Sequence, residues 1–297
     1  MPKQKIITVI GPTATGKTAL GIILANHFNG EIISADSREV YIGFDLGSGK
    51  ASPAEQTAAP HHLLDIMAAN IRYSAAQFQK DCYQKIAEIT SRKKLPIIVG
   101  GTGFYVRSVT EGYNFNEVQI KTEYRELENL TTEQLTKKLT SLGGTINLSD
   151  AQNKRRLIRA IQVAECGGKK QPNKSQFDYL QLYLDFPKEA LSQRILKRPD
   201  DRIEQGMIEE VKDLLANGAT PQFMFDLGLE YRFTTQYLQG EFRSYDEYRE
   251  KLFIATKQFA KRQRTWFNKD KNTIKLDMSC ETSIKKAITE VQNFLSK

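Results

Sequence analysis

Residues 11–18 are the part of this sequence whose types and spacing best suit the binding of phosphate. They fit the pattern G-x-x-x-x-G-K-[ST] and follow a short apolar run, as a phosphate-binding loop requires. The glycines let backbone N–H groups converge on phosphate oxygens, and the start of the next helix adds positive potential. Lys17 is expected to neutralise phosphate charge, and the Thr18 hydroxyl to help hold Mg²⁺. The loop residues are Gly11, Pro12, Thr13, Ala14, Thr15, Gly16, Lys17 and Thr18.

Two further polar segments directly follow apolar runs that read as strands. One is residues 35–38 and the other is residues 100–103, Gly-Gly-Thr-Gly. Ligands of open α/β sheets bind at the carboxyl ends of strands, so both segments are expected beside the loop. Asp36 could act as a general base or bind Mg²⁺ through water, or it could only cap a short helix. Thr102 could reach a diphosphate, or the segment could be an ordinary tight turn.

Two groups of basic residues lie in helical patterns. In residues 154–159, the apolar spacing leaves Arg155 and Arg159 together on an exposed face. A second group lies at residues 257–264. Such faces can bind the phosphates of a nucleic acid, or they can simply be solvated. The formal net charge of +8 and the phosphate loop favour a polyanionic partner.

Short apolar runs that alternate with amphipathic segments predict an α/β fold. Such alternation is typical of a parallel sheet, here carrying a P-loop, with helices on both of its faces. Strands are predicted at residues 6–10, 31–35, 95–99 and 179–184. Helices are predicted at residues 19–28, 74–92, 203–215, 245–267 and 284–295.

The composition changes after about Gly112 and predicts two domains. Residues 114–175 are polar, charged and mostly helical in pattern, and we interpret them as a helical insertion, with an exit loop at 167–172. Residues 1–113 and 176–297 are then the P-loop core. No run approaches the ~20 apolar residues of a membrane span. The three cysteines lie far apart, which indicates neither a disulfide framework nor a zinc site. A cytoplasmic protein is expected, with His61 and His62 in a loop.

Taken together, these motifs resemble those of the tRNA dimethylallyltransferases, also called tRNA isopentenyl transferases. The resemblance extends over almost the whole chain, in the order that the family shows. It is carried by residues 11–18, 32–41 (Ile-Ile-Ser-Ala-Asp-Ser-Arg-Glu-Val-Tyr), 60–65 (Pro-His-His-Leu-Leu-Asp), 97–105 (Ile-Ile-Val-Gly-Gly-Thr-Gly-Phe-Tyr), 156–160, 206–211 and 260–267 (Ala-Lys-Arg-Gln-Arg-Thr-Trp-Phe).

The resemblance implies a reaction and roles for the motif residues. Enzymes of this family transfer a dimethylallyl group from dimethylallyl diphosphate to N6 of the adenine 3′ of the tRNA anticodon, assisted by Mg²⁺. The loop would hold the leaving diphosphate together with Thr102 and Lys257, and Asp36 would take the proton from the amine. Lys257 stands where the family usually has arginine, so it keeps the charge and loses the bidentate fork.

The resemblance also implies contacts with the anticodon stem-loop, whose target adenine must be flipped into the site. A monomer without a membrane partner is expected. The implied RNA-binding residues are Asp36, Ser37, Arg38, Glu39, Arg125, Arg155, Arg156, Arg159 and Arg262.

Three other functions remain open from the sequence. An adenylate isopentenyltransferase would prenylate a free nucleotide, but would not need the insertion or the basic helices. A P-loop kinase could use the same loop with ATP, with Asp36 deprotonating an acceptor hydroxyl. A non-catalytic RNA-binding module would not require Lys17 and Thr18.

Overall fold

The computed structural model divides the chain into two compact units. The first comprises Met1–Gly112 and Ser175–Lys297, and the second comprises Tyr113–Lys174. The structure describes residues 3–115, 122–145, 151–165, 174–268 and 273–297, with the side chains of 122–125 left out.

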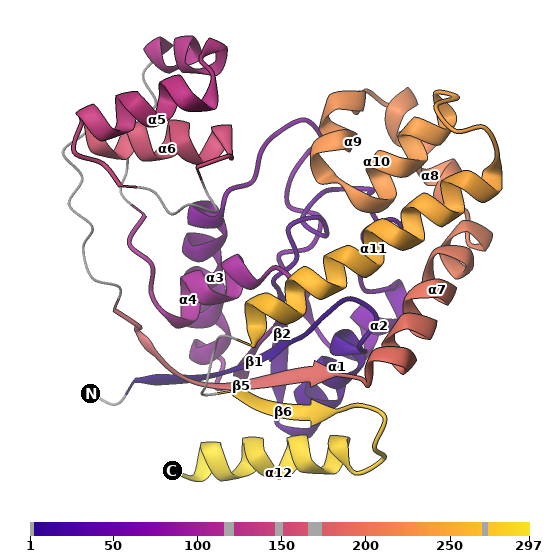
Figure 1. The fold of residues 1–297 in the computed structure, drawn as a ribbon. Coiled ribbons are helices and arrows are strands. Elements are labelled where there is room, and N and C mark those ends of the chain that lie inside the picture. The colour runs from indigo at the N-terminus through magenta and orange to yellow at the C-terminus, as the bar shows by residue number, and fades with distance from the viewer. Residues whose placement is uncertain (1–2, 116–121, 146–150, 166–173, 269–272) are drawn as a thin grey trace. The chain divides into compact units, whose positions relative to one another are not determined.

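A six-stranded sheet forms the centre of the first unit (Figure 1). Its strand order is β3-β2-β4-β1-β5-β6, and every neighbouring pair is parallel. The phosphate-binding loop follows the central strand β1, so its neighbours β4 and β5 end on either side of it. The strands are β1 (Gln4–Ile10), β2 (Gly30–Ser34), β3 (His61–His62), β4 (Leu95–Gly100), β5 (Phe177–Asp185) and β6 (Thr273–Asp277).

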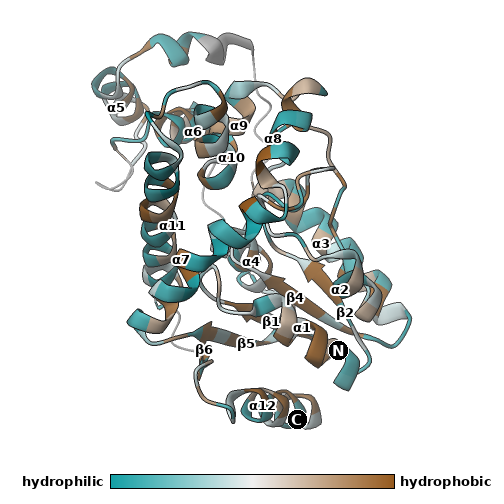
Figure 2. Cartoon of the chain, turned by 90° about the vertical axis from the view of Figure 1, so that its right-hand side faces the viewer, coloured by the Kyte–Doolittle hydropathy of each residue, from teal (hydrophilic) through white to brown (hydrophobic). Residues whose placement is uncertain are grey.

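Alternate side chains of the strands enter two separate apolar cores. Ile6 and Ile10 pack with helices α3 and α4 on one face, whereas Ile7 and Val9 pack with α1 and α12 on the other. The strands of the sheet are largely brown in Figure 2, the colour of apolar residues. The predicted class, an α/β fold with helices on both faces of a parallel sheet, is confirmed. These helices are α1 (Lys17–His27), α3 (Ala75–Ser91), α4 (Gly103–Thr110) and α12 (Ser283–Ser296).

A group of further helices lies beyond the carboxyl ends of the strands in the same unit. Its longest member, α11, begins at Tyr245, where the Ser244 side chain accepts a hydrogen bond from the Glu247 backbone N–H, and ends at Phe267 as predicted. None of the helices in the described ranges combines the length and apolar character that crossing a bilayer requires. The helices are α2 (Pro53–Ala58), α7 (Lys188–Glu204), α8 (Met207–Ala216), α9 (Pro221–Leu227), α10 (Leu229–Leu238) and α11 (Tyr245–Phe267).

Two local predictions were wrong. The helix predicted at 203–215 is instead the end of α7 followed by α8, because Gly206 has φ 102° and interrupts the helix. The apolar spacing runs on across this break, which hides it in the sequence. His61 and His62 form the edge strand β3 rather than a loop, pairing with β2.

The second unit is a small helical domain with its own apolar core. Leu135 and Leu139 of α5 pack against Leu157 and Ile161 of α6. The exit loop predicted at 167–172 lies outside the described residues. The elements are the 3₁₀ helix η1 (Thr122–Asn129), α5 (Thr132–Ser141) and α6 (Lys154–Glu165).

Candidate functional site

The phosphate-binding loop turns sharply between β1 and α1. A Cβ atom on Gly11 would lie 2.3 Å from the Leu184 carbonyl oxygen, so only glycine fits there. Gly16 adopts φ 83° directly before α1 begins at Lys17. The Lys17 ammonium group donates a hydrogen bond to the Pro12 carbonyl at 2.8 Å. The loop therefore places the start of α1 and a lysine at the carboxyl edge of the sheet.

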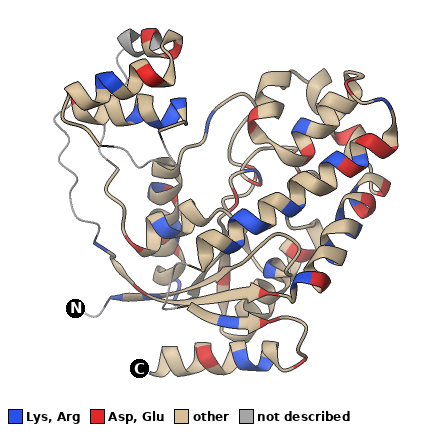
Figure 3. Ribbon diagram, viewed as in Figure 1, with Lys and Arg blue, Asp and Glu red and all other residues tan. Residues whose placement is uncertain are grey.

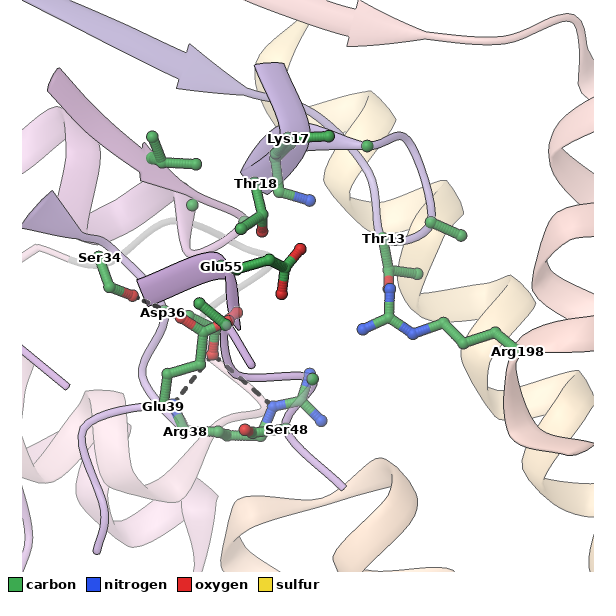
Figure 4. A pocket seen from close by; sticks show the side chains of 18 of the residues that line it. Thr13, Lys17, Thr18, Ser34, Asp36, Arg38, Glu39, Ser48, Glu55 and Arg198 are labelled. Carbon is green, nitrogen blue, oxygen red and sulfur yellow. Dashed lines mark hydrogen bonds and ion pairs between the residues drawn. The ribbon is translucent and has the colours of Figure 1, made fainter. Parts of the chain in front are cut away.

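A cavity of about 550 Å³ opens at this edge (Figure 4). One wall is the phosphate-binding loop, and the others come from the turn after β2, the end of β4, and helices α2, α7 and α11. Its charged lining residues are Lys17, Asp36, Arg38, Glu39, Glu55, Arg194, Lys197, Arg198, Asp201 and Arg202.

Positive charge dominates the side of the cavity formed by the loop and α7. The Arg198 Nε atom is buried and has no hydrogen-bond partner within the described part of the chain. Burial, followed by the charge of Arg202, lowers the pKa of Arg198 to about 9. Burial and then the charge of Arg198 lower the pKa of Lys17 to about 8. Cations that are crowded and desolvated in this way are stabilised by an anion, so the cavity is suited to a phosphate or diphosphate.

Asp36 lies in the turn after β2 and lines the same cavity. Its Oδ1 atom accepts the Arg38 backbone N–H at 3.0 Å, which fixes the turn. The Thr102 hydroxyl accepts the Ser37 backbone N–H at 3.1 Å. Asp36 thus faces the cavity, while Thr102 stands behind the turn and is not part of the cavity lining. The geometry suits a carboxylate base whose loop is held by a threonine.

Glu39 is a second acid at this position. Its carboxylate accepts a hydrogen bond from the Ser34 hydroxyl at 2.6 Å (Figure 4). Burial, followed by the negative charge of Asp36, raises the pKa of Glu39 to about 7. Near neutral pH this carboxyl can therefore hold a proton beside Asp36.

Gln263 of α11 joins the two halves of the site. Its side-chain oxygen accepts the Thr13 backbone N–H at 2.9 Å, and its amide nitrogen donates to the Gly101 carbonyl at 2.9 Å. Sequence analysis included Gln263 in a family motif without giving it a role. A buried amide in a basic helix could have indicated one, because buried polar groups need partners.

Three arginines and one glutamate form a charged group at the cavity: Arg38, Arg198 and Arg202 line it, and Glu230 is buried outside the lining. Glu230 of α10 accepts hydrogen bonds from Arg38 and Arg202, each at 2.7 Å. Arg198 and Arg202 come from α7, which the sequence analysis did not predict, since Pro199 lies inside it. Proline usually ends a helix, and this obscured the i, i+4 spacing of the two arginines.

The donor set near Thr18 fits a magnesium ion. Figure 4 shows Thr18 and Glu55 at the same part of the cavity. Hydroxyl and carboxylate oxygens are ligands that Mg²⁺ prefers, and it usually keeps several waters. Within the described ranges, no cluster of three or more His, Cys, Asp or Glu residues forms an all-protein metal cage.

Two predicted residues of α11 lie outside the cavity lining. Lys257 is exposed, with its Nζ atom 5.7 Å from the centre of the Phe253 ring. Arg262 is also exposed and lies 5.8 Å from the Phe259 ring. Both are on other faces of α11 from Gln263, since each residue turns by about 100° along a helix. Figure 3 shows the basic residues spaced along this helix.

The remaining predicted residues belong to the second unit. Arg155, Arg156 and Arg159 are exposed on α6, opposite the buried Leu157. Figure 3 marks the basic positions along this helix in blue. Arg125 lies in η1, and its side chain is outside the described part of the structure.

The fold and the site define a P-loop α/β protein with a cavity that is lined by cations and by a carboxylate. A family model described as IPP transferase matches residues 39–270. The chain belongs to this family, as its motifs predicted.

Similar proteins carry closely related names. The chain is 43 % identical over 277 residues to "tRNA dimethylallyltransferase 2" of Shewanella sediminis, covering 91 % of this chain and 90 % of that protein. It is 40 % identical over 302 residues to "tRNA dimethylallyltransferase" of Streptococcus equi subsp. zooepidemicus, covering all of both chains.

Solved structures agree with this assignment. A tRNA isopentenylpyrophosphate transferase of Bacillus halodurans has a TM-score of 0.75 and 33 % identity, covering 99 % of this chain and 96 % of its own. A eukaryotic dimethylallyltransferase acting on tRNA has a TM-score of 0.83 and 25 % identity, covering 99 % and 80 % respectively.

Proposed function

We propose that this chain transfers the dimethylallyl group of dimethylallyl diphosphate to N6 of the adenine 3′ of the anticodon in tRNA and releases diphosphate. The observation that carries the proposal is a single cavity with a phosphate-binding loop and α7 cations on one side and Asp36 on another. A diphosphate bound by these cations would leave on the side of the cavity opposite a base. Membership of the IPP transferase family supports the same reaction.

The cationic side of the cavity would stabilise the leaving group. As the allylic C–O bond breaks, its electron pair goes to the diphosphate oxygen, and negative charge grows there. Lys17, Arg198 and the backbone of the loop lie where they can bind that charge, and Arg198 Nε, which has no hydrogen-bond partner among the described residues, could donate to it. Mg²⁺ held through Thr18 would supply further charge neutralisation when bound.

Asp36 would act on the other side of the same reaction. The lone pair of adenine N6 attacks C1 of the dimethylallyl group, and one N6 proton passes to the Asp36 carboxylate. Thr102 would act through the Asp36 turn, because its hydroxyl holds the Ser37 N–H. This is a positioning role rather than direct contact with the diphosphate.

The RNA-binding residues would come from both units. Residues 36–39 line or border the cavity and would contact the flipped base, whereas Arg155, Arg156 and Arg159 of α6 would bind backbone phosphates of the anticodon stem-loop. Further positive charge for the RNA would come from Lys257 and Arg262, which are exposed. Arg125 of η1 would add to it. We place this activity in the cytoplasm and assign it to a monomer.

A transfer assay with two acceptors tests the proposal. Purified protein and Mg²⁺ receive labelled dimethylallyl diphosphate with either bulk tRNA or AMP. The proposal expects label in tRNA alone. Label in AMP alone would make the protein an adenylate isopentenyltransferase, and consumption of ATP without transfer of label would indicate a kinase.

A further inference from the structure

Glu230 occupies an unusual position for a charged residue. It lies in the first turn of α10 and is only 3 % exposed, and it is not part of the cavity lining. Its two carboxylate oxygens are used separately, Oε2 by Arg38 and Oε1 by Arg202. One buried carboxylate thus holds two buried guanidinium groups that do line the cavity.

Arg38 has two acidic neighbours, and they are held at different distances. Its Nη1 atom lies 2.7 Å from Glu230, whereas its Nε atom lies 3.9 Å from Oδ1 of Asp36. A small movement of the Arg38 side chain would close the second distance to that of a full ion pair. Glu230 therefore competes with Asp36 for the same guanidinium.

The Asp36 carboxylate remains largely available as a result. Its Oδ1 atom accepts the Arg38 backbone N–H, and Oδ2 accepts no hydrogen bond from the described residues. A carboxylate that formed a full ion pair with arginine would be a poorer proton acceptor, because the arginine stabilises its charged form.

We infer that Glu230 is a positioning residue for the transfer reaction: it holds Arg38 away from Asp36 and so keeps the Asp36 carboxylate free to accept the N6 proton. This inference rests on the proposed function, because it assumes that Asp36 is the base. It assigns a role to a residue that does not touch the substrate. Removing the Glu230 charge would leave Arg38 without its main partner, and Asp36, 3.9 Å from its Nε atom, is the other acid with which it pairs among the described residues.

The first experiment replaces Glu230 in the full chain by an uncharged residue of the same shape. For Glu230→Gln we expect kcat for transfer to tRNA to fall about tenfold or more, because a base contributes 10²–10⁴-fold and is only weakened here. The KM for dimethylallyl diphosphate should change by less than about threefold, since the loop and Arg198 are unaltered. The control is Asp226→Asn on neighbouring α9. It removes the exposed ion pair between Asp226 and Arg72 and should leave both constants unchanged.

The second experiment removes the Arg38 side chain, for which Glu230 and Asp36 compete. If freed Arg38 is what disables Asp36, then Glu230→Gln should have little effect once Arg38 is absent. We expect Arg38→Met and Arg38→Met/Glu230→Gln to have the same kcat within about twofold, and the double variant to be faster than Glu230→Gln alone. A loss of about tenfold in both backgrounds would show a merely structural role and overturn the inference.

The comparison separates three failures. Absence of transfer by the wild-type chain would contradict the proposed function itself. Transfer by the wild type with an unchanged kcat in Glu230→Gln would contradict only the inference about Glu230. If Glu230→Gln does not remain folded in thermal unfolding, the two Arg38→Met variants still give the decisive comparison, since they leave fewer buried charges unpaired.

Discussion

At the scale of single residues, the account depends on the Asp36 carboxylate. Asp36 lines the cavity opposite the cationic α7, and its turn is fixed by hydrogen bonds from the backbone of residues 37 and 38. These contacts place the side chain without using all of its acceptor capacity. This is the environment that a general base needs.

The Asp36→Ala variant should therefore lose transfer while keeping its fold. We expect kcat to fall by about 10²–10⁴-fold, the usual contribution of a positioned base, with tRNA affinity changed little. Single-turnover transfer and a tRNA binding titration measure the two effects. Asp178→Ala, an exposed acid on β5, is the matched control. Activity near that of the wild type would remove Asp36 as the base.

Glu39 should make stability depend on pH. Burial and the charge of Asp36 raise its pKa from 4.5 to about 7, so the folded state holds a proton that the unfolded state has released. The free energy of unfolding should therefore fall as pH rises from about 4.5 to about 7. The free energy of unfolding of the wild type, relative to that of Glu39→Gln, should therefore fall by about 1–3 kcal/mol between pH 5 and pH 8.

Urea unfolding at those two pH values measures this difference. Glu281→Gln, at an exposed position, should show no such change. An identical difference between wild type and Glu39→Gln at both pH values would mean that Glu39 does not hold a proton in the folded protein.

The sequence predicts that the loop and Asp36 lie together at one edge of the sheet, and both line the cavity, but it does not reveal the residues that support them. The loop and the acid are recognisable because they stand within a few residues of strand ends. Glu230, Arg198 and Gln263 lie far along the chain and meet the site only through tertiary packing. Their chemistry is visible in the sequence, but their partners are not.

At the scale of elements, α11 sets the geometry of the phosphate-binding loop. Gln263 connects that loop to the end of β4, so one side chain spans two turns. The sequence located the bounds of the helix, Tyr245–Phe267, but gave Gln263 no role, because the sequence does not show that this polar residue is buried.

Replacing Gln263 by leucine should loosen both turns. The Thr13 N–H and the Gly101 carbonyl would each lose a partner, at a cost of about 1–3 kcal/mol per group, so we expect unfolding to become easier by about 2–4 kcal/mol. The KM for dimethylallyl diphosphate should rise as well. Urea unfolding and steady-state kinetics test this, with exposed Gln258→Leu on the same helix as control. Equal stability of the two variants would contradict the account.

The basic face of α6 should contribute to RNA affinity alone. Reversing charge at Arg155 and Arg159 to glutamate should weaken tRNA binding by about tenfold or more, and reduce the slope of log affinity against log salt by about two. Filter binding over a range of salt concentrations measures this.

Dimethylallyl diphosphate affinity should not change in that variant. The control reverses Lys285 and Lys286 on α12, which are exposed in the other unit. An unchanged salt dependence in the α6 variant would remove these arginines from the RNA-binding surface.

At the scale of the whole molecule, the alternation of strands and helices along the chain was predictable, because the sequence signals for each element are local. β-branched runs and helix caps predict most strands and helices of the core, and the alternation of strands with helices predicts the parallel sheet. The break at Gly206 was missed because the apolar spacing continues across it, and α7 was missed because it contains Pro199. Local signals fail where tertiary contacts override them.

The molecule as a whole is proposed to couple cleavage of an allylic diphosphate to alkylation of one adenine. The most direct measurement supplies dimethylallyl diphosphate and Mg²⁺ with two synthetic anticodon stem-loops, one with adenine and one with guanine 3′ of the anticodon. Released diphosphate and incorporated dimethylallyl are quantified together. The account predicts one diphosphate for each group incorporated, with the adenine RNA only. Diphosphate release without incorporation, or equal incorporation into both RNAs, would contradict it.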